Sequence, residues 1–203
     1  MLTILIIALT TIISIAAFQF PALMNQLIFD PFTINTKKEY FRFISSGLLH
    51  GSWVHLIINM LVLYSFGQAV EYYFSELFGS KAHFYYLLLY VGALITSDIP
   101  TFNKHKNNVL YRGVGASGAV SAVVFSSILF NPLAKIYIWG IIGIPGIVLG
   151  VIYLIYSAKM SKQSMDNINH GAHFYGAVFG FVFTLILEPK LAIHFINELL
   201  SWL

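Results

Sequence analysis

Six long apolar stretches limit what this chain can fold into. A helix needs about 20 apolar residues to cross the hydrocarbon core of a bilayer, and each stretch approaches that length. Because 58% of the residues are hydrophobic and only 9% are charged, the composition is typical of a membrane protein. We therefore predict an all-α membrane protein, a bundle of six transmembrane helices that forms a single domain over residues 1–203. The stretches cover about residues 2–24, 53–72, 83–100, 114–131, 135–158 and 170–188.

Other features of the sequence argue against several other kinds of segment, chemistry and partner. No Lys or Arg precedes the first stretch, which favours a retained helix over a cleaved signal peptide. Residues 189–203 form a short amphipathic tail that we expect to lie on the membrane surface. The chain has no cysteine, so thiolate and disulfide chemistry are excluded. The net charge is +3, but its Lys and Arg residues are scattered over loops without a basic stripe, and we predict no nucleic-acid partner.

Polar side chains gather at the starts of three stretches. Inside a bilayer such groups are costly unless they are paired or solvated, so they mark candidate functional positions. Alternate helices of a bundle run in the same direction, which puts the three starts on one side of the membrane and at similar depth. The pattern predicts one site that contains all three clusters. They are His50 just before the second stretch with His55 and Asn59 inside it, Ser117 in the fourth, and His170 and His173 in the sixth.

Ser117 and His173 suit nucleophilic catalysis. A serine hydroxyl is a weak nucleophile until a base takes its proton, and histidine is the usual base at neutral pH. In many hydrolases a carboxylate orients that histidine. All eight acidic residues here lie in loops, in the tail or at the ends of stretches, so we expect no carboxylate at the depth of the site. The sequence therefore predicts a Ser-His dyad.

Acyl transfer also needs hydrogen-bond donors for a developing oxyanion. The Asn59 amide and the His55 imidazole can donate, and they share a helix face because they are four residues apart. Gly115 and Ala116 precede Ser117 at a helix start, where backbone N–H groups are free to donate.

Small residues predict close contact between the fourth and sixth helices. Gly176 and Gly180 are four residues apart in the sixth stretch, and Gly118 follows the serine in the fourth. Such residues let two helices approach closely, which would bring the serine and His173 within reach. His170 and His173 could instead bind a metal ion, but without an HExxH motif or a nearby carboxylate we predict no metal site.

Four motifs in the same order resemble the rhomboid family of intramembrane serine proteases. The likeness covers about residues 40–182, and we place the catalytic core at about 40–188. The motifs are HGSWVHLIIN at 50–59, FGQAVE at 66–71, GASG at 115–118 and AHFYGAVFG at 172–180.

The resemblance implies roles for individual residues. Ser117 would be the nucleophile and His173 the general base, with His55 and Asn59 in oxyanion roles. Gly115 would permit the turn before the serine. Structural roles would fall to His50, Arg42, Glu71, Gly118, Gly176 and Gly180, and we expect Glu71, at the end of its stretch, to form a hydrogen bond or ion pair.

Two positions depart from the family pattern. The family often has an aromatic residue four positions after the nucleophile, where it stacks on the base, and this chain has Ser121 there. His173 must therefore be oriented in another way. A Trp-Arg pair that is common in the first loop is replaced by Phe41-Arg42, an apolar substitution that we expect to preserve the packing.

The family resemblance implies an endopeptidase that needs no cofactor. Its substrates would be single-pass transmembrane proteins, cut near the start of their helix after small residues, with the residue 159–169 loop and the fifth span forming a lid and side gate. One alternative is a catalytically silent relative that binds and escorts transmembrane clients. Such relatives usually lack the serine or the histidine, and both are present. A transporter would require charged groups at mid-membrane, which the stretches lack.

The orientation that the family resemblance implies conflicts with the distribution of Lys and Arg residues. Six-span members of the family have a cytoplasmic amino terminus and an outward-facing site. The loops on the site's side, about 25–52, 101–113 and 159–169, carry eight of the eleven Lys and Arg residues, whereas cytoplasmic loops usually carry the excess. We follow the family, because compact re-entrant loops are expected to outweigh the charge count. We predict a multi-pass protein of the bacterial inner membrane with an extracytoplasmic site.

Overall fold

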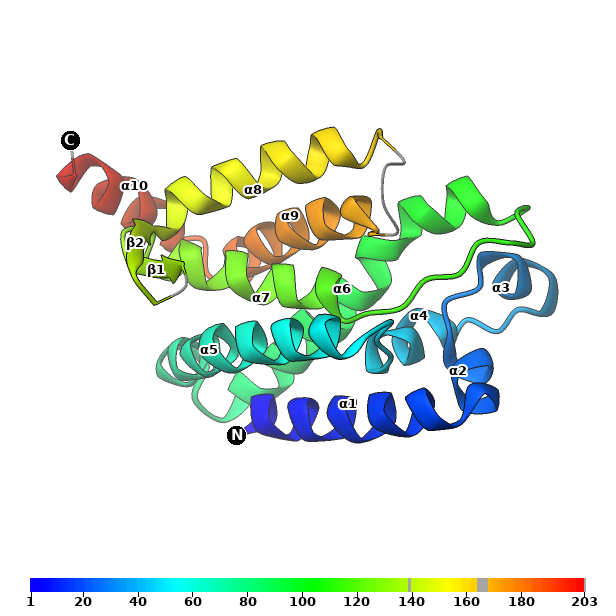
Figure 1. The fold of residues 1–203 in the computed structure, drawn as a ribbon. Coiled ribbons are helices and arrows are strands. Elements are labelled where there is room, and N and C mark those ends of the chain that lie inside the picture. Colours follow the sequence, from blue (N-terminus) through cyan, green and yellow to red (C-terminus); the bar gives the residue numbers. More distant parts are fainter. Residues whose placement is uncertain (139, 164–167, 203) are drawn as a thin grey trace.

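The computed structural model describes residues 1–138, 140–163 and 168–202 and shows a bundle of helices lying side by side (Figure 1). This confirms the predicted all-α membrane fold. By length and apolar composition, α1, the α5–α6 stretch and α9 are long enough to cross a membrane, whereas α7 and α8 are shorter. The bundle helices are α1 (Leu2–Gln19), α5 (Trp53–Phe78), α6 (Ala82–His105), α7 (Ser117–Phe130), α8 (Gly146–Met160) and α9 (His170–Leu187).

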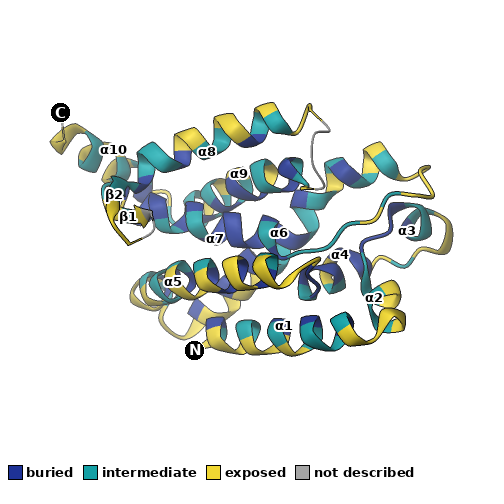
Figure 2. Cartoon of the chain, viewed as in Figure 1, coloured by how far each residue is buried: buried dark blue, intermediate teal, exposed yellow. Residues whose placement is uncertain are grey.

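Helix α7 lies at the centre of the bundle. It packs against α5, α6, α8 and α9, and most of its residues are buried (Figure 2). The helices around it expose apolar side chains outward, as expected for surfaces that face lipid. Examples of these exposed residues are Leu5, Leu9 and Ile12 in α1, Ile57 and Leu61 in α5, and Ile152 and Ile155 in α8.

Helix α7 is shorter than the hydrocarbon core is thick, which affects how deep in the membrane the helix begins. Its 14 residues extend about 21 Å at 1.5 Å per residue, whereas the hydrocarbon core is about 30 Å thick. Irregular backbone at membrane depth must have its polar groups satisfied by protein. Before α7, Gly113 exchanges two backbone hydrogen bonds of 3.0 Å with Phe29, and the Gly115 N–H donates to the Ser46 carbonyl at 3.1 Å. These backbone groups of Gly113 and Gly115 are therefore paired with protein groups, as a membrane interior requires.

The segment between α1 and α5 supplies that support because it is folded. Arg42 holds it together: the guanidinium donates to the carbonyls of Asn25 and Ile28 and forms an ion pair of 2.7 Å with Glu39. Its guanidinium carbon also lies 5.5 Å from the centre of the Phe41 ring, although Phe41 is half exposed. The segment contains α2 (Pro21–Leu27), α3 (Pro31–Lys37), α4 (Arg42–Ser45) and the 3₁₀ turn η1 (Ser46–Leu48).

The apolar stretch at 135–158 is not one helix, and the prediction of a helix at 135–145 was wrong. Strands β1 (Lys135–Ile138) and β2 (Ile142–Pro145) form an antiparallel hairpin there, and α8 starts only at Gly146. Hydropathy alone cannot separate a short apolar strand from a helix. β-branched and aromatic residues favour strands, and Gly140 takes the positive φ of 71° in the turn.

Two other boundaries differ from the prediction. Helices α5 and α6 each continue past the C-terminal end of the predicted apolar stretch, and the turn η2 (Gly79–Lys81) joins the two helices. Glu71 therefore lies inside α5 rather than at its end. Its carboxylate accepts the backbone N–H groups of Leu2 and Thr3 and so caps the start of α1, where a negative charge is favoured. The predicted amphipathic tail forms α10 (Leu191–Ser201).

Candidate active site

Ser117 is the first residue of α7, and glycine is required two residues earlier. Gly115 has a φ of +127°, a conformation that strains any other residue. A Cβ atom added to Gly115 would lie 2.8 Å from His55 Cε1 and 3.8 Å from Ser117 Oγ. Ala116, between them, is fully buried. The structure thus brings together His55, the turn at Gly115 and Ser117, as the sequence predicts.

His55 and Asn59 lie in the first two turns of α5. The Ser52 hydroxyl accepts the His55 N–H and caps this helix. Asn59 is buried, and its Nδ2 donates to the His55 carbonyl at 3.0 Å. A side-chain amide carries two N–H bonds, and this contact uses one of them inside the helix.

The His50 ring packs against the His55 ring. It lies edge-on to the His55 ring with the centroids 4.9 Å apart. Its Nδ1 lies 2.9 Å from Ser14 Oγ, and the same hydroxyl donates to the Leu48 carbonyl. Burial, followed by the nearby His55, lowers the pKa of His50 to about 4. His50 is therefore neutral at neutral pH and ties α1 to the start of α5.

Helices α7 and α9 form the most extensive contact in the bundle, which confirms the contact predicted from small residues. A Cβ atom on Gly176 would collide with the Gly118 carbonyl, and one on Gly180 with the Ala122 carbonyl. A Cβ on Gly118 would lie 3.4 Å from the Ala172 carbonyl oxygen. Gly118 and Ala172 are the chain neighbours of Ser117 and His173, so the helix starts that carry the predicted dyad abut.

Among the described residues, Tyr153 and His170 lie next to the His173 ring. The Tyr153 ring of α8 stacks on it, with centroids 6.1 Å apart and planes 14° apart. The His170 ring lies edge-on at 5.7 Å. In the described residues no group of three or more His, Asp or Glu gathers in a way that could hold a metal ion.

A polar cluster at the start of α9 was not predicted from the sequence. Asn169 caps this helix by accepting the Ala172 N–H, and its Nδ2 donates to Asp98 at 3.1 Å and to the Thr101 hydroxyl at 3.1 Å. The expectation that no carboxylate reaches the depth of the site was therefore wrong for Asp98. Asp98 lies in α6, and its partner Asn169 is 71 residues away in the chain, so no local sequence pattern reveals this contact.

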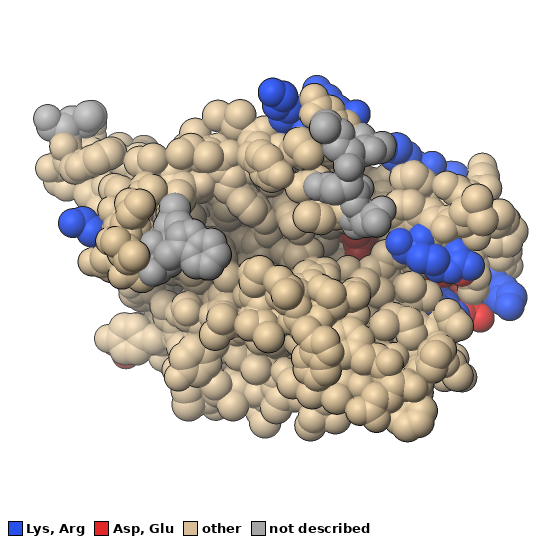
Figure 3. All heavy atoms as spheres, viewed as in Figure 1, with Lys and Arg blue, Asp and Glu red and all other residues tan. Residues whose placement is uncertain are grey.

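The surface around the site is asymmetric in charge and in shape. Figure 3 shows Lys and Arg side chains gathered at the end of the bundle where α3, the end of α6 and the end of α8 lie. On the same face the surface is hollowed between α8 and α5, over α7 (Figures 1 and 3). The basic residues of the three loops on that side are Lys37, Lys38, Arg42, Lys104, Lys106, Arg112, Lys159 and Lys162.

Comparison with known proteins identifies the fold. A family model of the rhomboid domain matches residues 37–190. The putative rhomboid protease YdcA of Bacillus subtilis (strain 168) is 31% identical over 152 residues, which cover 75% of this chain and 69% of that protein. The chain belongs to the rhomboid family. It is also 32% identical to the rhomboid protease GluP of the same organism over 165 residues, 80% of this chain and 29% of GluP.

A plant relative shows a similar match. The mitochondrial RHOMBOID-like protein 12 of Arabidopsis thaliana is 28% identical over 144 residues, which cover 66% of this chain and 42% of that protein. The chain thus spans less than half the length of this relative and of GluP.

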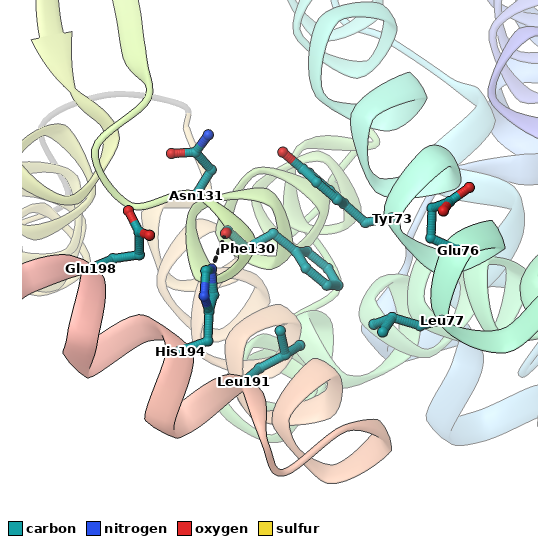
Figure 4. A pocket seen from close by; sticks show the side chains of 8 residues that line it. All are labelled: Tyr73, Glu76, Leu77, Phe130, Asn131, Leu191, His194 and Glu198. Carbon is teal, nitrogen blue, oxygen red and sulfur yellow. Dashed lines mark hydrogen bonds between the residues drawn. The ribbon is translucent and has the colours of Figure 1, made fainter.

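A pocket of about 430 Å³ at the opposite end of α7 is not part of this rhomboid site (Figure 4). It lies beside Phe130, the last residue of α7, whereas Ser117 is the first. His194 of α10 anchors the pocket wall, because its Nε2 lies 2.8 Å from the Phe130 carbonyl oxygen. The lining residues are Tyr73, Glu76, Leu77, Phe130, Asn131, Leu191, His194 and Glu198.

Proposed function

We propose that this rhomboid protein is a serine endopeptidase that cleaves single-pass transmembrane proteins near or within their helix. The observation that carries the proposal is the meeting of His55, the positive-φ turn at Gly115 and Ser117 at the start of α7. The abutting start of α9 adds His173. A half-buried serine at a helix start, close to His55 and with His173 on the abutting helix start, suits acyl transfer at membrane depth.

In the proposed reaction His173 takes the proton of Ser117 Oγ as the oxygen attacks the scissile carbonyl carbon. The carbonyl oxygen becomes an oxyanion, and the Asn59 amide, the His55 ring and backbone N–H groups at Ala116 and Ser117 donate to it. His173 then gives the proton to the leaving amine, which frees the first product. Water, deprotonated by the same histidine, releases the acyl group and restores the serine.

The hollow between α8 and α5 gives a route for the substrate (Figure 3). A transmembrane helix that approaches from the lipid would enter there and reach Ser117 at the start of α7. Residues 164–167 of the loop predicted as a lid lie outside the described residues. No metal or cofactor takes part in this scheme.

The alternative function is that of a silent relative that binds and escorts clients. The presence of Ser117 and His173 on abutting helix starts favours the protease, because an escort needs neither side chain. The names of YdcA and GluP, which describe proteases, support the same choice.

The deciding experiment measures cleavage of a single-pass reporter in proteoliposomes. We expect the native chain to cleave it, Ser117→Ala to be inactive, and Ser127→Ala, ten residues along the same helix, to cleave like the native chain. Equal cleavage by Ser117→Ala would contradict the proposed mechanism. Absence of cleavage by all three chains, with the reporter retained on the protein, would favour the escort.

We also propose a bacterial inner membrane location with the site on the extracytoplasmic side. This orientation puts the basic end of the molecule outside (Figure 3), against the usual charge distribution. With six spans, both termini would be cytoplasmic. A reporter enzyme that is active only in the cytoplasm, fused after Leu203, should therefore be active, and a silent reporter on a folded fusion would overturn the orientation.

A further inference from the structure

Helix α8 supplies the aromatic ring that position 121 lacks. The Tyr153 ring is nearly parallel to the His173 ring, with the planes 14° apart and the centroids 6.1 Å apart. This is an offset-stacked arrangement, which aromatic rings prefer to direct superposition. The ring of His173 therefore has a flat neighbour that limits how far it can tilt.

Ser121 fixes the other end of this tyrosine. The Ser121 Oγ lies 2.6 Å from the Tyr153 hydroxyl, and Ser121 is buried in α7 with 4% of its surface exposed. The Phe125 ring, one turn further along α7, also packs against Tyr153 with centroids 6.0 Å apart. Tyr153 thus connects α8, which carries it, to α7 through Ser121 and to α9 through His173.

We propose that Tyr153 is a positioning residue for His173 and that Ser121 holds Tyr153 in place. The inference rests on the proposed protease function. A base that must take a proton from Ser117 depends on the direction of its ring, and a small misplacement lowers the rate strongly. An aromatic face also favours the positive charge that the imidazole carries after proton transfer.

The small side chain at 121 makes this arrangement possible. Ser121 leaves room for a ring that enters from α8, and its hydroxyl bonds to that ring's hydroxyl. The departure from the family pattern at this position is therefore compensated by Tyr153. Because α8 also borders the hollow above α7 (Figure 3), the base is fully supported only while α8 is packed against α9.

The proposal is tested by steady-state cleavage kinetics of the reporter with matched variants. For Tyr153→Ala we expect kcat to fall about ten- to a hundred-fold with KM changed by less than about twofold. Tyr153→Phe keeps the ring and loses only the hydrogen bond, so its kcat should fall only about threefold. Ile152→Ala is the control, because Ile152 precedes Tyr153 on α8 and is exposed.

A double variant that moves the aromatic ring from α8 to α7 distinguishes positioning of His173 from a general effect on packing. The double variant S121Y/Y153A moves the ring from α8 to α7, and we expect it to recover most of the kcat that Tyr153→Ala loses. Unchanged kcat in Tyr153→Ala, while Ser117→Ala is inactive, would refute the positioning role and leave the protease function intact. A loss that the double variant does not recover, and that follows the fraction of folded protein, would also refute it. Activity in Ser117→Ala would instead remove the protease function itself.

Discussion

Replacement of His173 by alanine is expected to lower the cleavage rate by about 10³-fold or more. Without the imidazole, no group takes the proton of Ser117 as it attacks, and none returns it to the leaving amine. The measurement is the initial rate of reporter cleavage in proteoliposomes at equal amounts of folded protein. His83→Ala is a suitable control, because the His83 side chain is 67% exposed and lies on α6.

The double variant of Ser117 and His173 sharpens this prediction. Residues that act as a unit have non-additive effects, so S117A/H173A should be no slower than either single variant. A rate for His173→Ala within about tenfold of the native chain would contradict the dyad, since general bases contribute about 10²–10⁴-fold.

Replacement of Gly180 by leucine is expected to destabilise the bundle by about 3 kcal/mol or more, the upper part of the range for overpacking. Even a Cβ atom at this position would collide with the Ala122 carbonyl of α7. Relief would require α7 and α9 to separate, which would also strain the hydrogen bond of 2.8 Å between Thr184 and Ser126. The substitution would therefore disrupt the α7–α9 contact, which is the most extensive helix contact in the molecule.

The measurement is the midpoint of unfolding in mixed detergent micelles. Gly171→Ala is the control on the same helix, because among the described residues a Cβ there would meet only Asn169 Oδ1, at an ordinary 3.4 Å. We expect the control to unfold like the native chain and Gly180→Leu to unfold much earlier or fail to accumulate. Equal midpoints for the native chain and Gly180→Leu would show that α7 and α9 do not pack as described.

The sequence predicts the parts of this structure that depend on local pattern. Apolar length indicates the bundle, and the spacing of Gly176 and Gly180 indicates the α7–α9 contact, whereas the turn at Gly115 was expected from the family resemblance. Each signal lies within a few residues of the feature that it predicts.

Features that depend on distant partners could not be predicted in this way. Tyr153 is one of two tyrosines in the apolar helix α8, and only the fold places it on His173, 20 positions away in the chain. Asp98 similarly meets Asn169 through packing of α6 against α9. The hairpin at 135–145 was missed for another reason, because an apolar strand and an apolar helix have the same hydropathy.

The most direct test of the central claim is covalent labelling with a fluorophosphonate, which reacts with serine only when a base has activated it. After labelling and digestion, mass spectrometry locates the modified residue. We predict a single adduct on Ser117 in the native chain and none on Ser117 in folded His173→Ala. Labelling of Ser117 that is equally fast without His173, or an adduct on another serine in its place, would contradict the account.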